Sequence, residues 1–211
     1  MKLASFCEPS GPPKLGIVDH EIIYDLGNFA SGPLEIFQRE ISFAQIEKEL
    51  KGANALKLSE ICLLPPVPKP SKFLGIAFNY KDHAKEMNRE LPQDQIWFNK
   101  QNTCVIGPNQ AIKIPTLSSA VDYEAELGIV IKKSGRYIKP EDAHNYVAGY
   151  LIVNDVSARD WQFRTPTWTL GKSFDTHGPI GPFLVSPDEI KDPHNLRIKT
   201  WVNDELRQNS T

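Results

Sequence analysis

The chain has 211 residues and a formal net charge of −2, from 24 basic and 26 acidic side chains. This near balance gives no reason to expect a nucleic-acid partner or a membrane-surface partner. No uncharged apolar run is long enough for a transmembrane helix. The three cysteines form no CxxC motif, so neither a zinc ribbon nor a disulfide framework is indicated. We therefore expect a reducing compartment. No clear targeting signal opens the sequence, so the cytoplasm and the mitochondrial matrix are both compatible with it.

The first 62 residues predict a small α/β unit. Apolar runs at 15–18 and 22–26 indicate two strands, and apolar side chains at helical spacing indicate a helix over 36–50. Residues 63–70 then contain four prolines, which cannot continue a helix or a central strand and favour an extended linker. We therefore place a domain boundary in this proline-rich segment.

Residues 71–211 predict a second, larger domain. Short strands are expected at five places, which are 73–78, 96–98, 124–131, 147–153 and 196–202. A helical turn is expected at 82–87 after an Asp82 cap, and a short helix at 140–145. Gly-Pro clusters, including those at 178–182, separate several of the strands. The expected class is α+β, mostly β, with a few short helices.

Three carboxylates could hold a metal ion. Glu124 and Glu126 are two positions apart on a predicted strand, so their side chains would share a face. Asp155 directly follows another predicted strand, where its side chain can reach a site built from loops. Oxygen ligands without Cys or clustered His favour Mg²⁺, Mn²⁺ or Ca²⁺ over Zn²⁺. The alternative is that the two glutamates form the solvated face of an edge strand.

His83 and Glu86 are the candidates for proton transfer. They are three residues apart on a predicted helical turn, where a carboxylate can hold one imidazole nitrogen and leave the other free to accept a proton from water. The alternative is an exposed histidine on a polar turn.

Two other segments carry polar residues that suit a small acid substrate. Arg159 and Gln162 could donate to an anion or a carbonyl, or Arg159 could simply pair with Asp160 on a solvated loop. Lys172 could neutralise an oxyanion or an enolate beside a metal, or lie on a surface turn. The Lys172 segment is not a phosphate loop, because Pro166 occupies the position of the leading glycine.

Four segments, in the same order along the chain, resemble motifs of the fumarylacetoacetate hydrolase superfamily. They are GIAFNYKDH at 75–83, DYEAEL at 122–127, GYLIVNDVSARD at 149–160 and GKSFD at 171–175. The chain looks most like the members named for a fumarylacetoacetate-hydrolase domain. The resemblance implies a mixed β-roll or β-sandwich, usually a homodimer, with one divalent metal ion.

The resemblance also implies a role for each candidate residue. Glu124, Glu126 and Asp155 would bind the metal, with Thr176 beside it through water. His83 and Glu86 would activate water, and Lys172 would stabilise developing negative charge. Arg159 and Gln162 would contact the substrate. His20, His144, His177 and His194 are given no role.

The expected activity is a metal-dependent hydrolase that cleaves C–C bonds of small β-dicarbonyl or acylpyruvate-type oxo acids. The same site could serve an oxaloacetate tautomerase or a decarboxylase. Family members usually continue past the hairpin at 198–206 into further strands and a threonine- and glycine-rich loop. We therefore expect a catalytic domain that is incomplete at its C-terminus, and a catalytically inactive truncated member is the third alternative.

Overall fold

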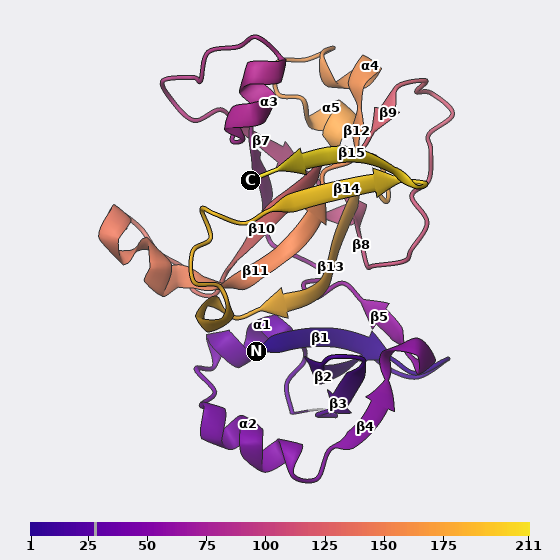
Figure 1. The fold of residues 1–211 in the computed structure, drawn as a ribbon, viewed down its shortest axis with the longest axis vertical. Coiled ribbons are helices and arrows are strands. Elements are labelled where there is room, and N and C mark those ends of the chain that lie inside the picture. The colour runs from indigo at the N-terminus through magenta and orange to yellow at the C-terminus, as the bar shows by residue number, and fades with distance from the viewer. Residues whose placement is uncertain (28) are drawn as a thin grey trace.

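The computed structural model describes residues 1–27 and 29–211 (Figure 1). Strands hold 34% of the residues and helices 21%, which confirms the α+β, mostly β, class. Most strands of the described residues belong to one nine-stranded sheet, with the central order β10-β11-β13-β1-β2-β3-β4. These strands are β1 (Lys2–Cys7), β2 (Lys14–Asp19), β3 (Ile22–Asp25), β4 (Asn54–Lys57), β10 (Ala125–Ile131), β11 (Val147–Asn154) and β13 (Gly178–Val185). Two short strands, β5 (Cys62–Leu64) and β8 (Val105–Ile106), pair with β1 and β13.

The N-terminal strands and the C-terminal strands meet inside this sheet. β1 pairs antiparallel with β13, so that Lys2 lies opposite Val185 and Leu3 opposite Leu184. The proline-rich segment runs beside this junction, with its first two residues in β5 and the rest outside any strand. A hydrogen-bonded ladder thus joins the predicted 1–62 unit to the predicted 71–211 domain, and the boundary at 63–70 stays a prediction.

Two short helices, α1 (Pro33–Gln38) and α2 (Phe43–Leu50), replace the single helix expected over 36–50, which is wrong. Glu40 has a left-handed φ of 50° and stops the first helix. Ser42 then starts the second with a capping box, in which its hydroxyl accepts from the Gln45 N–H and the Gln45 side chain accepts from the Ser42 N–H. Ile36 and Ile46, one from each helix, are both buried in the same core cluster, so the apolar spacing looks continuous.

The prediction that the Gly-Pro residues at 178–182 separate strands is also wrong, because they form the first half of β13. The pairing of β13 with β11 shifts register between Tyr150 and Ile152. Gly181 has a φ of 128° there, which side chains rarely adopt, and Pro182 follows it. Pro182 has no N–H to donate to a regular ladder, and Gly181 has an irregular backbone. Both residues are accommodated here because the ladder is itself irregular at the register shift.

Three further strand pairs and three short helices lie in the upper half of the view of Figure 1. Three strand pairs are β6 (Phe73–Ile76) with β7 (Trp97–Lys100), β9 (Val121–Asp122) with β12 (Ser157–Ala158), and β14 (Ile198–Val202) with β15 (Glu205–Ser210). The helices are α3 (Lys81–Glu86), α4 (Arg159–Gln162) and α5 (Thr169–Lys172). Short 3-10 helices cover 58–60, 102–104, 140–146 and 187–189. The five strands expected in the larger domain correspond to β6, β7, β10, β11 and β14.

The expected Asp82 cap of α3 is wrong. The helix begins one residue earlier, Tyr80 is its N-cap, and no side chain caps it. The Asp82 carboxylate instead accepts a hydrogen bond from the Ser210 hydroxyl at 2.8 Å. Asp82 therefore connects α3 to the end of β15.

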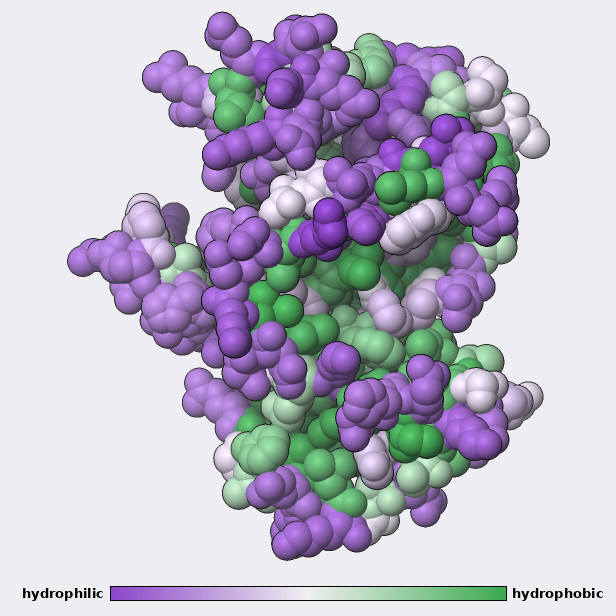
Figure 2. Space-filling model, viewed as in Figure 1, coloured by the Kyte–Doolittle hydropathy of each residue, from purple (hydrophilic) through white to green (hydrophobic). Residues whose placement is uncertain are grey.

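Hydrophilic residues cover much of the face seen in Figure 2, but hydrophobic residues gather across its middle, between the β14–β15 hairpin and the N-terminal strands. Ile129, Ile131 and Ile152, from β10 and β11, are each more than half exposed. The opposite side of β11 is buried, with Leu151 and Val153 in a core cluster with Ile180 and Leu184 of β13. No helix within the described ranges 1–27 and 29–211 is long and apolar enough to cross a lipid bilayer.

Gly171→Ala is expected to lower the free energy of unfolding by about 1–3 kcal/mol, because the added methyl group overpacks the contact between α4 and α5. A Cβ at Gly171 would lie 2.7 Å from the carbonyl oxygen of Ala158 and closer still to the backbone of Gln162. Urea unfolding measures the change. Gly52→Ala is the matched control, since its Cβ would meet nothing within 4 Å. Equal midpoints for the two variants would contradict the prediction.

Candidate functional site

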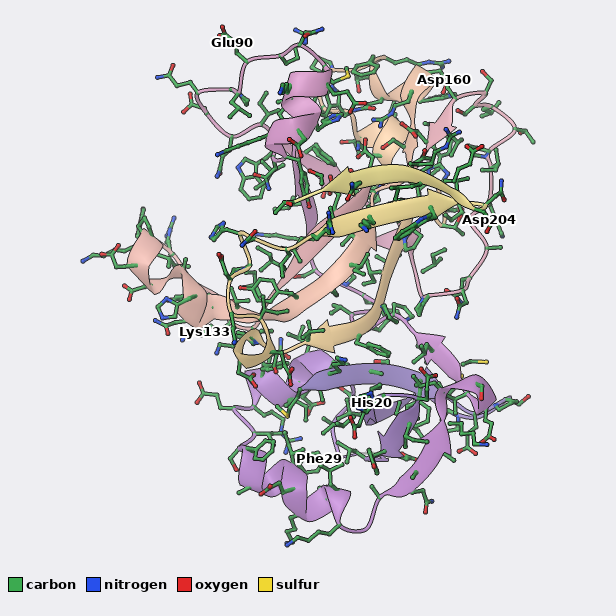
Figure 3. The ribbon with its side chains drawn as sticks, in the orientation of Figure 1. His20, Phe29, Glu90, Lys133, Asp160 and Asp204 are labelled. Carbon is green, nitrogen blue, oxygen red and sulfur yellow. The ribbon has the colours of Figure 1, made fainter. Side chains whose placement is uncertain are left out.

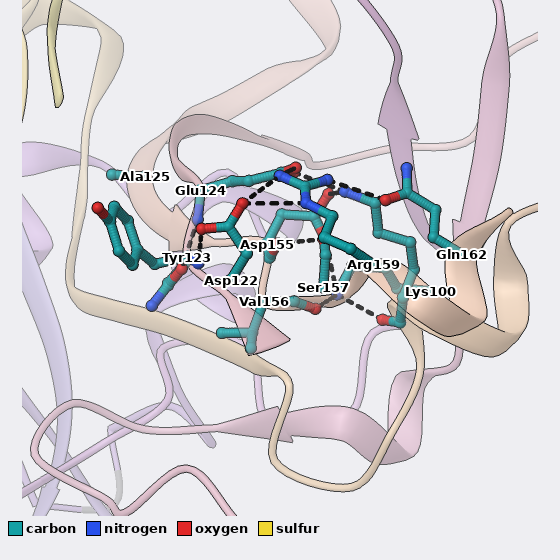
Figure 4. Close-up of polar contacts among 12 residues, drawn as sticks. Lys100, Asp122, Tyr123, Glu124, Ala125, Asp155, Val156, Ser157, Arg159 and Gln162 are labelled. Atoms are coloured by element: carbon teal, nitrogen blue, oxygen red, sulfur yellow. Dashed lines mark hydrogen bonds and ion pairs between the residues drawn. The ribbon is translucent and has the colours of Figure 1, made fainter. Parts of the chain in front are cut away.

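Four acidic side chains come together where β9, β10 and β11 meet, and three of them, Asp122, Glu124 and Asp155, are labelled in Figure 4. Asp122 ends β9, Glu126 lies in β10, and Asp155 follows β11. The Asp155 N–H donates to the carbonyl of Glu124 at 2.8 Å, which fixes the two residues side by side. Glu124, Glu126 and Asp155 can each offer a carboxylate oxygen, and these three oxygens lie within 4.8 Å of one another. The structure thus brings together the three acids that the sequence suggested as metal ligands.

Two buried lysines hold Asp155. The Lys100 Nζ donates to Oδ1 of Asp155 at 2.6 Å, and the Lys172 Nζ donates to Oδ2 at 2.6 Å. Lys172 also pairs with Oε2 of Glu124 at 2.5 Å. These side chains are almost fully shielded from solvent, since Asp155 is 1% exposed and each lysine is 2% exposed. Lys172 is therefore an interior residue of the site and not a surface lysine on a turn.

Sequence reasoning missed Lys100, which ends β7. Its ammonium group also donates to the carbonyl oxygens of Lys172, at 2.5 Å, and of Val156, at 3.3 Å. The sequence offers one signal for Lys100. It lies two residues after Phe98, and residues two apart on a strand share a face, so Lys100 would point to the same side as the buried Phe98. A lysine in phase with a buried aromatic residue on a short strand suggests a buried cation that needs a carboxylate partner.

Arg159 and Gln162 lie on α4, at the rim of the acidic cluster. The Arg159 guanidinium pairs with Asp122 at 2.7 Å and with Glu124 at 2.5 Å. Its Nη1 donates to the amide oxygen of Gln162 at 2.9 Å. Asp160, the alternative partner of Arg159, accepts from the Ser118 hydroxyl instead. In this structure Arg159 orients Glu124, and its contact with substrate stays a prediction.

The charges of the cluster leave one carboxylate without a close cation. Burial alone would raise the pKa of Asp155, but Lys100 and then Lys172 outweigh it and hold that pKa below its usual range. Burial, helped by the nearby Asp155 and Glu124, raises the pKa of Glu126 to about 8. Among the residues that the structure describes, no lysine forms an ion pair with Glu126, whereas Glu124 and Asp155 each have at least one.

A divalent cation fits this donor set. Three carboxylate oxygens converge, no sulfur or imidazole nitrogen joins them in the described part of the chain, and hard oxygen ligands suit Mg²⁺ or Mn²⁺. A cation bound beside Glu126 would also supply the positive charge that its buried carboxylate lacks.

His83 and Glu86 are exposed on α3, and no hydrogen bond joins them. The His83 ring stacks on Phe78, with the ring centroids 6.2 Å apart. The start of α3 is nonetheless fixed beside the acidic cluster, because the Tyr80 hydroxyl accepts from the Leu127 N–H at 2.8 Å. The structure therefore places α3 next to β10, without assembling the two residues as a hydrogen-bonded pair.

Thr176, which the resemblance places beside the metal, and the histidines without an assigned role have different surroundings in the structure. Thr176 accepts from the Lys113 N–H through its hydroxyl at 2.7 Å. His177 is fully buried, and neither of its ring nitrogens has a hydrogen-bond partner. Burial, followed by the charge of Lys100, lowers the pKa of His177. His20 is exposed in the turn between β2 and β3, far from α4, where Asp160 lies (Figure 3).

Comparisons with known proteins show the family to which this chain belongs. Residues 72–211 match the family model described as fumarylacetoacetate (FAA) hydrolase C-terminal. The chain is 43% identical to the oxaloacetate tautomerase fahd2, mitochondrial, of Xenopus laevis, over all of this chain and 69% of that protein. It is 46% identical to human oxaloacetate tautomerase FAHD2A, mitochondrial, over 72% of this chain and 49% of that protein. The chain thus spans about two thirds of the frog protein and about half of the human one.

Solved structures show the same fold over the whole of this chain. A fumarylacetoacetate hydrolase from Exiguobacterium antarcticum is 33% identical, with a TM-score of 0.86, and this chain covers 75% of it. A maleylpyruvate hydrolase from Sphingobium, solved with manganese(II) and pyruvate, is 29% identical, with a TM-score of 0.82 and 76% coverage. The chain belongs to the fumarylacetoacetate hydrolase superfamily, whose members are metal-dependent hydrolases, isomerases and tautomerases.

Proposed function

We propose that this chain catalyses the keto–enol tautomerisation of oxaloacetate or a closely similar oxo acid. The observation that carries the proposal is the convergence of the carboxylates of Glu124, Glu126 and Asp155, two of which, Glu124 and Asp155, are paired with the buried ammonium group of Lys172. The names of the frog and human relatives, both oxaloacetate tautomerases, support this reaction over the others that the family performs.

Glu124, Glu126 and Asp155 would hold one divalent cation, and we propose Mg²⁺ or Mn²⁺. When bound, such a cation polarises the carbonyl group of an oxo acid as a Lewis acid and so makes the neighbouring C–H more acidic. The manganese(II) and pyruvate in the Sphingobium maleylpyruvate hydrolase support this choice of ion and of ligand class.

The chain's own residues would handle charge and proton. Lys172, with its ammonium group fixed by two carboxylates, would stabilise the negative charge that develops on the substrate oxygen. Arg159 lies at the rim, where it would orient Glu124 and attract a substrate carboxylate. His83 would carry a proton between C3 and the substrate oxygen, because tautomerisation moves one proton from carbon to oxygen without net loss.

Hydrolysis of a C–C bond is the second candidate. It is favoured by the two hydrolases among the solved structures and by Glu86, three residues from His83 on the same helix. In that reaction His83, held by Glu86, would take a proton from the attacking water. The exposed His83 and Glu86 would first have to form the hydrogen bond that they lack in this structure.

One assay separates the candidates. Enol oxaloacetate, mixed with the protein and Mg²⁺ or Mn²⁺, should lose its enol absorbance faster than in buffer while the total oxaloacetate stays constant. Release of CO₂ would show decarboxylation, and release of two acids from an acylpyruvate would show hydrolysis. If the enol decays at the buffer rate with metal bound, the tautomerase proposal is wrong. If, in addition, neither CO₂ nor two acids are released, the chain is an inactive member of the family.

We further propose that the protein is a homodimer and, like its relatives by name, mitochondrial. The exposed Ile129, Ile131 and Ile152 on the β10–β11 face support a self-association surface. Light scattering on the purified chain measures the oligomeric state.

Glu126→Gln is expected to weaken Mg²⁺ and Mn²⁺ binding roughly tenfold or more, because it removes a charged oxygen ligand and keeps the shape of the side chain. Isothermal calorimetry measures the affinity. Glu141→Gln removes an acid from the exposed 3-10 helix at 140–146 and is the matched control. An unchanged affinity in Glu126→Gln would rule Glu126 out as a ligand.

His83→Ala is expected to slow tautomerisation by a factor of about 10² to 10⁴ while leaving metal affinity unchanged, because the residue moves a proton and touches none of the proposed ligands. Stopped-flow absorbance and calorimetry measure the two quantities on the same samples. His144→Ala, at another exposed histidine, is the control. A full rate in His83→Ala would mean that another group carries the proton.

A further inference from the structure

Two cysteines that are remote in sequence lie directly opposite each other in the main sheet. β1 and β5 pair antiparallel, and the last residue of β1, Cys7, is the partner of the first residue of β5, Cys62. Residues opposite each other in an antiparallel pair have Cα atoms about 4.5–5.5 Å apart. That separation lies within the range that a disulfide bond spans.

The side chains of the two cysteines lie on the same side of the strand pair, and both are accessible to solvent. Cys62 is exposed and Cys7 is partly exposed, whereas the third cysteine, Cys104, is fully buried. Burial and the adjacent Cys62 thiol raise the pKa of Cys7. Cys62 is thus the thiol that a reagent in solution meets first, and Cys7 is the thiol next to it.

Metal binding does not explain the pair. Among the described residues, Glu124, Glu126 and Asp155 are the one group of three acidic, histidine or cysteine side chains placed to share an ion. Cys7 and Cys62 therefore lack the third and fourth ligands that a zinc site needs. Two thiols alone are suited to forming a bond with each other.

We infer that Cys7 and Cys62 form a redox-modification site, at which a small disulfide such as oxidised glutathione creates a Cys7–Cys62 disulfide within the chain. The thiolate of Cys62 attacks the small disulfide and releases one small thiol. The thiolate of Cys7 then attacks the sulfur of Cys62 in the mixed disulfide and releases the second. The two protein thiols are oxidised and lose two protons, and the small disulfide is reduced to two thiols that take them up.

The bond links the start of the chain to the strand that leads into the proline-rich segment. β1 also pairs with β2 and β13, so the bond attaches β5 to the centre of the main sheet. Intracellular disulfides of this exposed kind are reversible and serve as sensors more often than as permanent cross-links.

Peptide mapping of the full chain tests the inference. The protein is incubated with oxidised glutathione, acid-quenched, alkylated and digested with trypsin. The expected product joins the peptides 3–14 and 58–72, which hold Cys7 and Cys62, and leaves the peptide 101–113 of Cys104 alkylated. Reduction should restore both free peptides.

The same oxidation in urea is the control for folding. In the unfolded chain Cys62 is nearer along the sequence to Cys104 than to Cys7, so bonds to Cys104 should appear in comparable or greater amounts. In the folded protein the Cys7–Cys62 bond should exceed them at least tenfold.

Single variants decide the order of the steps. Cys7→Ser should stop at a stable glutathione adduct on Cys62, and Cys104→Ser should oxidise like the unaltered chain. The inference is overturned if the folded, unaltered protein keeps glutathione on Cys62 without forming the link, or if Cys62 bonds instead to a second copy of the chain.

Discussion

The buried carboxylate of Asp155 is the group on which the arrangement of the site depends. Each of its oxygens is paired with a different lysine, Lys100 from β7 and Lys172 from α5. An ionised carboxylate in this position without its partners would be strongly destabilising, because its desolvation would go uncompensated. β7, the end of β11 and α5 must therefore dock in one relative position. That docking also fixes Glu124, which Lys172 holds at the same time.

The carboxylates could be predicted from the sequence because the two-residue period of a strand is a local property. Glu124 and Glu126 share a face for that reason, and Asp155 is close because it follows the neighbouring strand. Lys100 could not be predicted in the same way, since its partner is 55 residues away and only the tertiary fold brings them together. The pairing of Cys7 with Cys62 across β1 and β5 could not be predicted for the same reason, because the register between strands from distant segments leaves no local signal in the sequence.

Errors in the predicted elements also have local causes. The apolar period over 36–50 is continuous because both helices contribute to one core, and only the capping box at Ser42 marks the break. β13 was misread because its glycines and prolines normally end strands. A register shift with β11 accommodates them, and such a shift depends on the partner strand and not on the residues alone.

The pairing of β1 with β13 has a consequence for the order of folding. Lys2 and Leu3 pair with Val185 and Leu184, which are far from them along the sequence. Contacts of such large sequence separation form slowly, because a long loop must close before any of them is made. Ser5–Cys7 of β1 can pair with β5 early, whereas Lys2 and Leu3 stay unpaired on this edge until β13 is available. During that interval β1 is open to pairing with other chains, so a chaperone that shields strand edges would raise the yield of folded protein.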